Sequence, residues 1–210
     1  MTRHLALLAV LFCAASPVLA DSGRFVRLFD GKTFDGWEGN LSSFRIEEGA
    51  VVAGSLEGRI PHNEFLCTKK QYGDFELRLK AKIIGPGQNA GVQFRSKRVP
   101  NSSEVAGYQC DVGRHDGRSI WGCLYDEARR RKFLVYSDAK EIAKVVKPDD
   151  WNDMVIRSEG PRVQIWINGL RTVDYTEEDE MIPRQGTIGL QIHVGPPAEA
   201  WYKDIEIREL

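Results

Sequence analysis

Residues Phe75–Lys82 alternate strictly between apolar and charged side chains. Successive side chains of a β-strand point to opposite faces, so this pattern predicts a strand with one buried face and one solvated face. A helix would spread the same apolar residues around its circumference. Shorter runs rich in Val, Ile, Phe, Tyr and Trp repeat the alternation along the chain. The pattern therefore favours a fold built from strands.

Glycine and proline divide the chain into further candidate strands. These are Phe44–Ile46, Ala50–Ala53, Ala90–Arg95, Gly107–Val112, Lys132–Tyr136, Trp151–Ser158, Arg162–Ile167, Arg171–Tyr175, Thr187–His193 and Trp201–Arg208. Asn168-Gly169 is the strongest hairpin signal, because both residues tolerate positive φ. Asp126–Lys132 has room for about two helical turns, but its charges leave no apolar face.

About ten or more short strands without helical crossovers predict an all-β fold, a jelly-roll sandwich of two antiparallel sheets. No internal repeat or linker divides the chain, so we expect one domain over residues 24–210. The first and last strands of a sandwich often pair. Arg27–Phe29 and Ile205–Ile207 are the candidates for that pairing.

The first twenty residues have the pattern of a signal peptide. Arg3 and His4 precede the apolar stretch Leu5–Ala15, and Val18–Ala20 supplies small residues at the cleavage positions before Asp21. The apolar stretch is too short for a stable membrane anchor, so no membrane insertion is expected. The sequence thus predicts an exported protein, periplasmic or extracellular.

Charge and cysteine content limit the partners and cofactors. The chain has 29 basic and 30 acidic residues, well mixed, and no basic stripe that would suit nucleic acid. Cys110 and Cys123 are the nearest cysteine pair in an oxidising compartment, and either a disulfide or buried free thiols fit the pattern. Cysteine and histidine spacing does not fit zinc. Asp30 and Asp204 are candidate ligands for a structural cation such as calcium, although their position near turns favours solvated surface carboxylates.

Residues Gln109–Phe133 hold the densest collection of functional side chains. Asp111 and Glu127 are candidate acids or bases, and Trp121 and Tyr125 are aromatic. Aromatic faces and charged groups together suit a polar, ring-shaped ligand such as a sugar. A long hairpin with solvated charges is the alternative interpretation.

The alternation of apolar and polar residues divides the side chains of three predicted strands between a core face and an outer face in the same way. Each predicted strand turns apolar residues to the core and leaves polar residues on the outer face: Gln93 and Arg95, then Gln109 and Asp111, then Gln191 and His193. If the strands are neighbours, this face carries a base, an acid and a fixed cation. Exposed sheet faces are usually polar, but short amides and planar guanidinium groups are typical of ligand binding.

Several motifs in order resemble the DUF1080 family, the 3-keto-disaccharide hydrolase domain. The resemblance rests on Leu28–Trp37, Asn89–Arg95, Gly107–Gly113, Trp121–Glu127, Trp151-Asn152 and Trp166–Gly169, and it covers residues 26–210. It implies a concanavalin A-like sandwich related to laminin G and glycoside hydrolase family 16 domains, and cleavage of sugars oxidised at C3. The family 16 strand with its paired carboxylates is missing, so a mechanism with two carboxylates is not supported.

A ketone at C3 acidifies the C2 proton, so a base can remove it while the C1 substituent leaves. This chemistry needs a base, a proton donor and an electrophile for the enolate oxygen. We assign these roles as hypotheses to His193, Asp111 and Arg95, with Glu127 as an alternative acid or base. Candidate sugar-binding residues are Asn89, Gln93, Gln109, Trp121, Tyr125, Arg130 and Gln191.

Two other functions remain open from the sequence. A lectin-like module would use the same aromatics and amides without catalysis, and its titratable groups would have ordinary pKa values. A surface adhesion domain would expose an apolar area near Trp121, whereas an enzyme would have a concave polar pocket.

Overall fold

The computed structural model describes residues 23–210. The predicted signal peptide lies outside this range. None of the helices in the described part has the length and apolar character that a membrane span requires.

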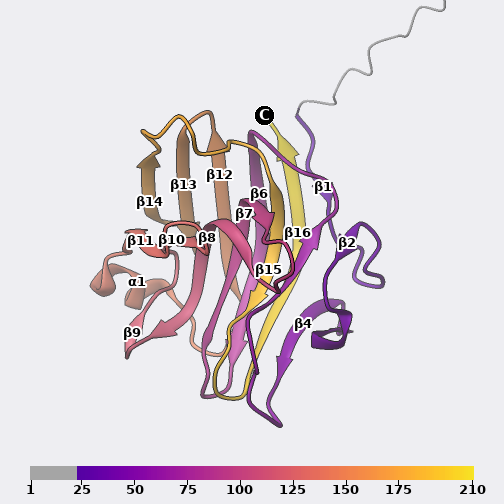
Figure 1. The fold of residues 1–210 in the computed structure, drawn as a ribbon. Helices are drawn as coiled ribbons and strands as arrows, with labels where there is room; N and C mark the ends of the chain where they lie inside the picture. Colours follow the sequence, from indigo (N-terminus) through magenta and orange to yellow (C-terminus); the bar gives the residue numbers. More distant parts are fainter. Residues whose placement is uncertain (1–22) are drawn as a thin grey trace, which may run out of the picture.

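Two antiparallel eight-stranded sheets form a sandwich (Figure 1). Sheet 1 contains, in spatial order, β14 (Leu170–Thr176), β13 (Arg162–Ile167), β12 (Asn152–Glu159), β6 (Phe75–Ile84), β16 (Ala198–Glu209), β4 (Ala50–Ser55) and β3 (Phe44–Glu47), with β1 (Val26–Arg27) beside β16. Sheet 2 contains β11 (Lys132–Val135), β10 (Leu124–Glu127), β8 (Val105–His115), β7 (Asn89–Arg98), β15 (Thr187–Ile192), β5 (Glu64–Thr68) and β2 (Trp37–Glu38), with β9 (Arg118–Ser119) beside β8. The predicted fold class is confirmed.

Helical structure in the described chain is limited to two short elements. These are the 3-10 turn η1 (Leu41–Ser43) and the helix α1 (Ala139–Val145). Asp138 caps the start of α1, because its carboxylate accepts the backbone N–H groups of Lys140 and Glu141. Asp126–Lys132 forms no helix, because positive φ angles at Ala128 and Arg131 turn the chain between β10 and β11. The α1 helix buries only Ile142 and lies at the edge of the sandwich near β9 (Figure 1).

The inward faces of both sheets form one apolar core. Leu77 and Leu79 of β6 pack there with Val92 of β7 and Leu190 of β15, as the alternation predicts. Tyr202 of β16 crosses this core, and its hydroxyl lies 2.7 Å from the backbone oxygen of Gln191 in sheet 2. The bond ties the two sheets together beneath the polar face of β15.

The predicted Asn-Gly hairpin and the end-strand pairing are present. Asn168 and Gly169 have φ angles of 47° and 83° in the tight turn between β13 and β14. Val26 and Arg27 pair with Ile207 and Glu206. The sequence interpretation missed β2, β5, β9 and β10, and β10 is the one that matters for the site.

Candidate active site

Three adjacent strands of sheet 2 form the floor of the site. In the antiparallel register Gln93 lies opposite Gln109, and Gly91 separates Asp111 from Gln191. The side chains of Gln93, Gln109, Asp111 and Gln191 therefore share one face, as the alternation predicted. All four are at most 2% exposed, so this face is covered rather than solvated.

A chain of side-chain hydrogen bonds crosses the floor towards Asp111. Ser96 Oγ donates to Gln93 Oε1 at 2.8 Å, and Gln93 Nε2 donates to Gln109 Oε1 at 2.6 Å. Gln109 Nε2 then donates to Asp111 Oδ1, also at 2.6 Å. Each amide uses its oxygen on one side and its N–H on the other, so the row has a direction. It fixes Asp111 Oδ1 as the acceptor.

The other oxygen of Asp111 has no such partner. Within residues 23–210, Asp111 Oδ2 and Gln191 Oε1 are buried polar atoms without a hydrogen bond. Burial raises the pKa of Asp111 well above its usual range, and the nearby charge of Glu127 adds to this, whereas the bond from Gln109 opposes it. Asp111 is thus a carboxyl group that retains its proton to unusually high pH.

Strand β10 brings Tyr125 and Glu127 over this floor. Tyr125 lies opposite Gln109 in the register, and Glu127 opposite Gly107. Gln191 Nε2 donates to Glu127 Oε2 at 3.4 Å. Burial raises the pKa of Glu127, and the charge of Glu104 raises it further. Burial and the neighbouring carboxylates also raise the pKa of the Tyr125 phenol, so the phenol remains an O–H donor.

His193 follows β15 and is half-buried at the rim. Its backbone N–H donates to Asn89 O at 3.1 Å, and its Nδ1 lies 2.6 Å from Val194 O. A carbonyl oxygen only accepts, so Nδ1 carries the proton and the neutral ring presents the Nε2 lone pair. Asn63 holds the next residue, because its Oδ1 accepts the Val194 N–H at 2.9 Å.

These groups surround one pocket that is open to solvent and has about 420 Å³ of empty space when its mouth is included. Its lining comprises Asn89, Gln109, Asp111, His115, Ile120, Tyr125, Glu127, Phe133 and His193. Tyr125 and Phe133 pack edge to face with ring centroids 4.9 Å apart, which gives the pocket an aromatic wall. A base, two carboxyl groups of raised pKa and an aromatic wall lie together. This arrangement suits acid–base chemistry on a sugar ring.

The prediction for Arg95 was wrong. A β-bulge between Phe94 and Lys97, with Arg95 at φ 47°, breaks the alternation. The guanidinium points away from the pocket and donates to Gly73 O at 2.9 Å, Gly160 O at 2.7 Å and Asp74 Oδ1 at 2.7 Å. Arg95 is a buried structural tie and cannot supply the electrophile.

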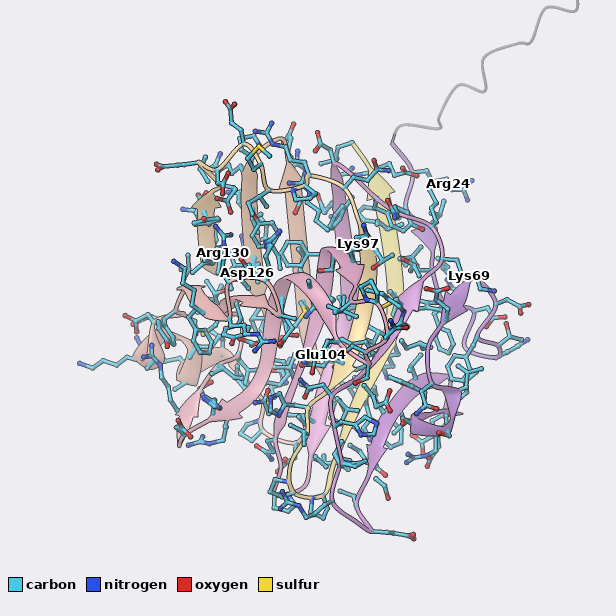
Figure 2. The ribbon with its side chains drawn as sticks, in the orientation of Figure 1. Arg24, Lys69, Lys97, Glu104, Asp126 and Arg130 are labelled. Atoms are coloured by element: carbon cyan, nitrogen blue, oxygen red, sulfur yellow. The ribbon has the colours of Figure 1, made fainter. Side chains whose placement is uncertain are left out.

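The predictions that Trp121 and Arg130 wall the pocket were also wrong. Trp121 is 6% exposed and belongs to the apolar core. Arg130 binds Asp126 and Glu177, and Figure 2 shows it beside Asp126. Although burial opposes it, the bonds from Arg130 and Tyr108 lower the pKa of Glu177 to about 2. This network fastens the turn after β10 and holds that strand in place.

The proposed cation site finds no supporting geometry. Asp30 and Asp204 line one hollow, but Asp30 Oδ1 already accepts the backbone N–H groups of Lys32 and Thr33, each at 2.8 Å. Among residues 23–210 no three His, Cys, Asp or Glu side chains are grouped to hold a metal ion. The carboxylate oxygens that calcium would need are therefore not gathered around Asp30 and Asp204 in the described residues. Cys110 and Cys123 are buried free thiols rather than a disulfide.

Several residues of the site were absent from the sequence interpretation. Phe133, His115 and Ile120 line the pocket, and Asn63 and Ser96 support it. A signal for β10 was present, because Leu124 and Asp126 are buried while Tyr125 and Glu127 face the pocket. The buried charge of Asp126 hid that alternation.

Comparison with solved structures identifies the fold. A protein from Parabacteroides distasonis, provisionally named a glycosyl hydrolase, is 18% identical with a TM-score of 0.67, over 89% of this chain and 94% of that one. A carbohydrate-binding module from Bacillus subtilis is 13% identical (TM-score 0.59; 83% and 96% covered). A β-glucanase from Bacillus licheniformis is 8% identical (TM-score 0.56; 89% and 97% covered). All are similar in the concanavalin A-like sandwich.

Comparison with curated proteins gave no match. A family model, in contrast, matches nearly the whole described chain, over residues 24–208. Its span includes β8 and β10, which bear Asp111 and Glu127, and also His193, which follows β15. The chain belongs to the family of the 3-keto-alpha-glucoside-1,2-lyase-like domain.

Proposed function

We propose that this protein is an exported enzyme that cleaves the C1–O glycosidic bond of 3-keto-glycosides by elimination. The base removes the C2 proton, the electron pair of the C2–H bond forms a C1=C2 double bond, and the C1–O bond breaks. The leaving oxygen takes a proton from an acid. Water that adds back across the double bond turns the elimination into net hydrolysis.

The observation that carries the proposal is the pairing of His193 with Asp111 across one pocket. His193 has its Nδ1 proton engaged by Val194 O, so its Nε2 lone pair is free to take the C2 proton. Asp111 keeps its proton because burial raises its pKa, so it can protonate the leaving oxygen. A proton acceptor and a proton donor that line the same pocket are what the reaction needs.

The enolate oxygen at C3 requires donors other than Arg95. Tyr125 and Asn89 both line the pocket, and each offers an uncharged N–H or O–H donor. The raised pKa of Tyr125 keeps its hydroxyl protonated while negative charge develops on the substrate. Glu127 lies beside them and is the alternative base, because a raised pKa makes a carboxylate more basic.

Isotopes test the reaction directly. The purified protein is incubated in D₂O with a 3-keto-disaccharide and with its unoxidised parent, and an enzyme-free sample corrects for spontaneous exchange. Elimination followed by hydration places deuterium at C2 of the released 3-keto sugar, and elimination alone yields the unsaturated ketone. Direct displacement at C1 would leave protium at C2 and would contradict the proposal. The unoxidised parent should remain intact.

Variants separate the two candidate bases. His193→Ala should lower kcat about a hundredfold or more, the usual scale for a general base. Glu127→Gln keeps the size of the side chain and should have a smaller effect if His193 is the base. The reverse order of the two effects would transfer the role to Glu127.

A carbohydrate-binding module is the second candidate, because the fold is also that of such a module from Bacillus subtilis. That function predicts saturable sugar binding in calorimetry and no turnover of any oxidised substrate. The raised pKa values of Asp111 and Glu127 favour the enzyme.

A further inference from the structure

A second hollow lies where the chain passes from β4 to β5, and we call it the β4–β5 groove. Its lining comes from η1, the end of β4, the connection to β5, Glu64 at the start of β5 and Ile192 at the end of β15. The groove is open to solvent and has about 730 Å³ of empty space when its mouth is included. It shares no lining residue with the pocket that contains Asp111 and His193, so it is a separate place for a ligand.

The floor of the groove is apolar and held in shape by the backbone. Ile60 and Ile192, which line it, are at most 6% exposed. Gly54 has a φ of 85°, and a Cβ there would lie 2.4 Å from Ala198 O and 3.0 Å from Ile192 Cγ1. Arg45 Nη1 donates to Gly54 O at 3.0 Å and fixes this end of β4. The floor is therefore pre-organised for the apolar part of a small molecule.

A buried carboxylate adjoins this apolar floor. Glu64 is 5% exposed, and its Oε1 accepts hydrogen bonds from Asn40 Nδ2 at 2.8 Å and from His62 Nε2 at 2.9 Å. Asn40 and His62 line a neighbouring hollow that shares Glu64 with the groove, so both bind the carboxylate from that hollow. Within residues 23–210 no donor reaches Glu64 Oε2. A buried carboxylate oxygen without a donor is costly, and a ligand that supplies one removes this cost.

The charges around the groove select the sign of such a ligand. Glu57 and Arg59 are its other charged lining residues, and both are exposed. Their charges are opposite, so they offset one another. Arg59 forms no ion pair with any described residue and does not neutralise Glu64. Glu64 is thus the uncompensated charge of the groove, and it favours a cation over an anion.

We propose that the β4–β5 groove binds a protonated primary amine with an apolar body. The ammonium group donates to Glu64 Oε2, and the apolar body packs against Ile60 and Ile192. A purely apolar molecule would leave Oε2 without a donor. This site does not depend on the reaction in the pocket.

The groove is also joined to the segment that carries His193. Ile60 N donates to Gly195 O at 2.9 Å, and Gly195 N donates to Ile60 O at 3.0 Å. Gly195 lies two residues after His193. The backbone amide of Gly195 is therefore a natural reporter of a ligand that packs on Ile60.

A titration with a pair of probes tests the site without turnover. Cyclohexylamine, which is protonated at neutral pH, is added to isotopically labelled protein while backbone amide signals are followed. Saturable shifts are expected at Gly54, Ile60 and Gly195. Cyclohexanol has the same ring without the charge and should bind about tenfold more weakly or worse, the scale of a hydrogen bond to a charged group. Equal affinities for the two probes, or shifts confined to the strands of the pocket, would overturn the proposal.

Two matched variants assign the effect to Glu64. Glu64→Gln keeps the size of the side chain and an oxygen for Asn40, so it should weaken cyclohexylamine about tenfold and leave cyclohexanol unchanged. Glu57→Gln makes the same exchange at an exposed lining residue and should change neither affinity by more than about twofold. An unchanged affinity for the amine in folded Glu64→Gln would contradict the site. If that variant does not fold, the comparison of the two probes in the wild type still decides.

Discussion

Gln109 Nε2 lies 2.6 Å from Asp111 Oδ1, and Gln109 Oε1 accepts from Gln93 at the same distance. Gln109 thereby assigns one oxygen of Asp111 to the protein and leaves the other for the proton. The two oxygens of an ionised carboxylate are chemically equivalent, so the contacts that the protein makes decide which of them takes the proton.

Replacement of Gln109 by Met keeps the length of the side chain and removes both hydrogen bonds. The bond from Gln109 lowers the pKa of Asp111, so its loss should raise that pKa further. In the proposed mechanism Asp111 acts in its protonated form, and the high-pH limb of the activity profile should therefore move to higher pH. The variant should also lose about tenfold in kcat through poorer orientation of Asp111.

A full pH–rate profile checks this, with Gln164→Met on β13 as the matched control, since the Gln164 side chain donates to Asp174 in sheet 1 and does not line the pocket. An unshifted high-pH limb in Gln109→Met would remove Asp111 from the role of acid.

Asp111→Asn should lower kcat about a hundredfold or more, because the amide cannot give up a proton to the leaving oxygen. The free energy of unfolding of the variant, in contrast, should increase relative to that of the wild type as pH rises. The pKa of Asp111 is higher in the folded than in the unfolded state, so the wild type is stabilised at low pH and loses that stability as pH rises above about 4.

The asparagine does not ionise and escapes this loss. The Tm of Asp111→Asn relative to wild type should therefore increase with pH, which calorimetry between acid and neutral pH can measure. A difference in Tm that stays constant with pH would mean that Asp111 ionises normally in the fold.

Asn63 should position His193 through Val194. Its Oδ1 accepts the Val194 N–H, and its Nδ2 donates to Glu104 at 3.2 Å. Asn63→Ala should lower kcat about tenfold and leave KM nearly constant, because the backbone that orients the imidazole loses its anchor. Steady-state kinetics and the imidazole NMR signals of His193 report this.

Glu104→Gln is the control, since its amide can accept the same bond from Asn63. An equal loss in both variants would assign the effect to the charge of Glu104 rather than to the anchor.

Arg95→Lys should reduce stability rather than catalysis. An ammonium group cannot reproduce the three contacts to Gly73, Asp74 and Gly160, so about 2 kcal/mol or more of the free energy of unfolding should be lost. Urea denaturation measures the change, and kcat is measured well below the denaturation midpoint. A large fall in kcat with unchanged stability would return Arg95 to the catalytic residues.

Sequence alone predicted the floor of the site because it obeys simple alternation. Gln93, Gln109, Asp111 and Gln191 share a face since their strands run without interruption there. Arg95 lies only two residues after Gln93, but it departs from the alternation because the bulge adds a residue there. The bulge accompanies tertiary contacts of Arg95 to the carbonyls of Gly73 and Gly160, which the local sequence pattern does not reveal.

The sequence interpretation missed strand β10 for a different reason. Asp126 is fully buried yet charged, and it is tolerated because Arg129 and Arg130 bind it. A pattern based on hydrophobicity reads such a residue as exposed. The prediction for Trp121 was wrong for the opposite reason. An aromatic residue beside glycine was assigned to ligand binding, but such a residue packs in the core as readily as it contacts a ligand.

The hydrogen bond from Tyr202 to Gln191 O connects sheet 1 to β15, one of the strands that form the floor of the site in sheet 2. The same hydroxyl lies 3.2 Å from Gly91 O, so one phenol reaches the backbone under both Gln191 and the neighbour of Asp111. The height of the pocket floor is consequently set by the thickness of the core. Substitutions in sheet 1 can thus shift the floor of the pocket without changing any residue that lines it.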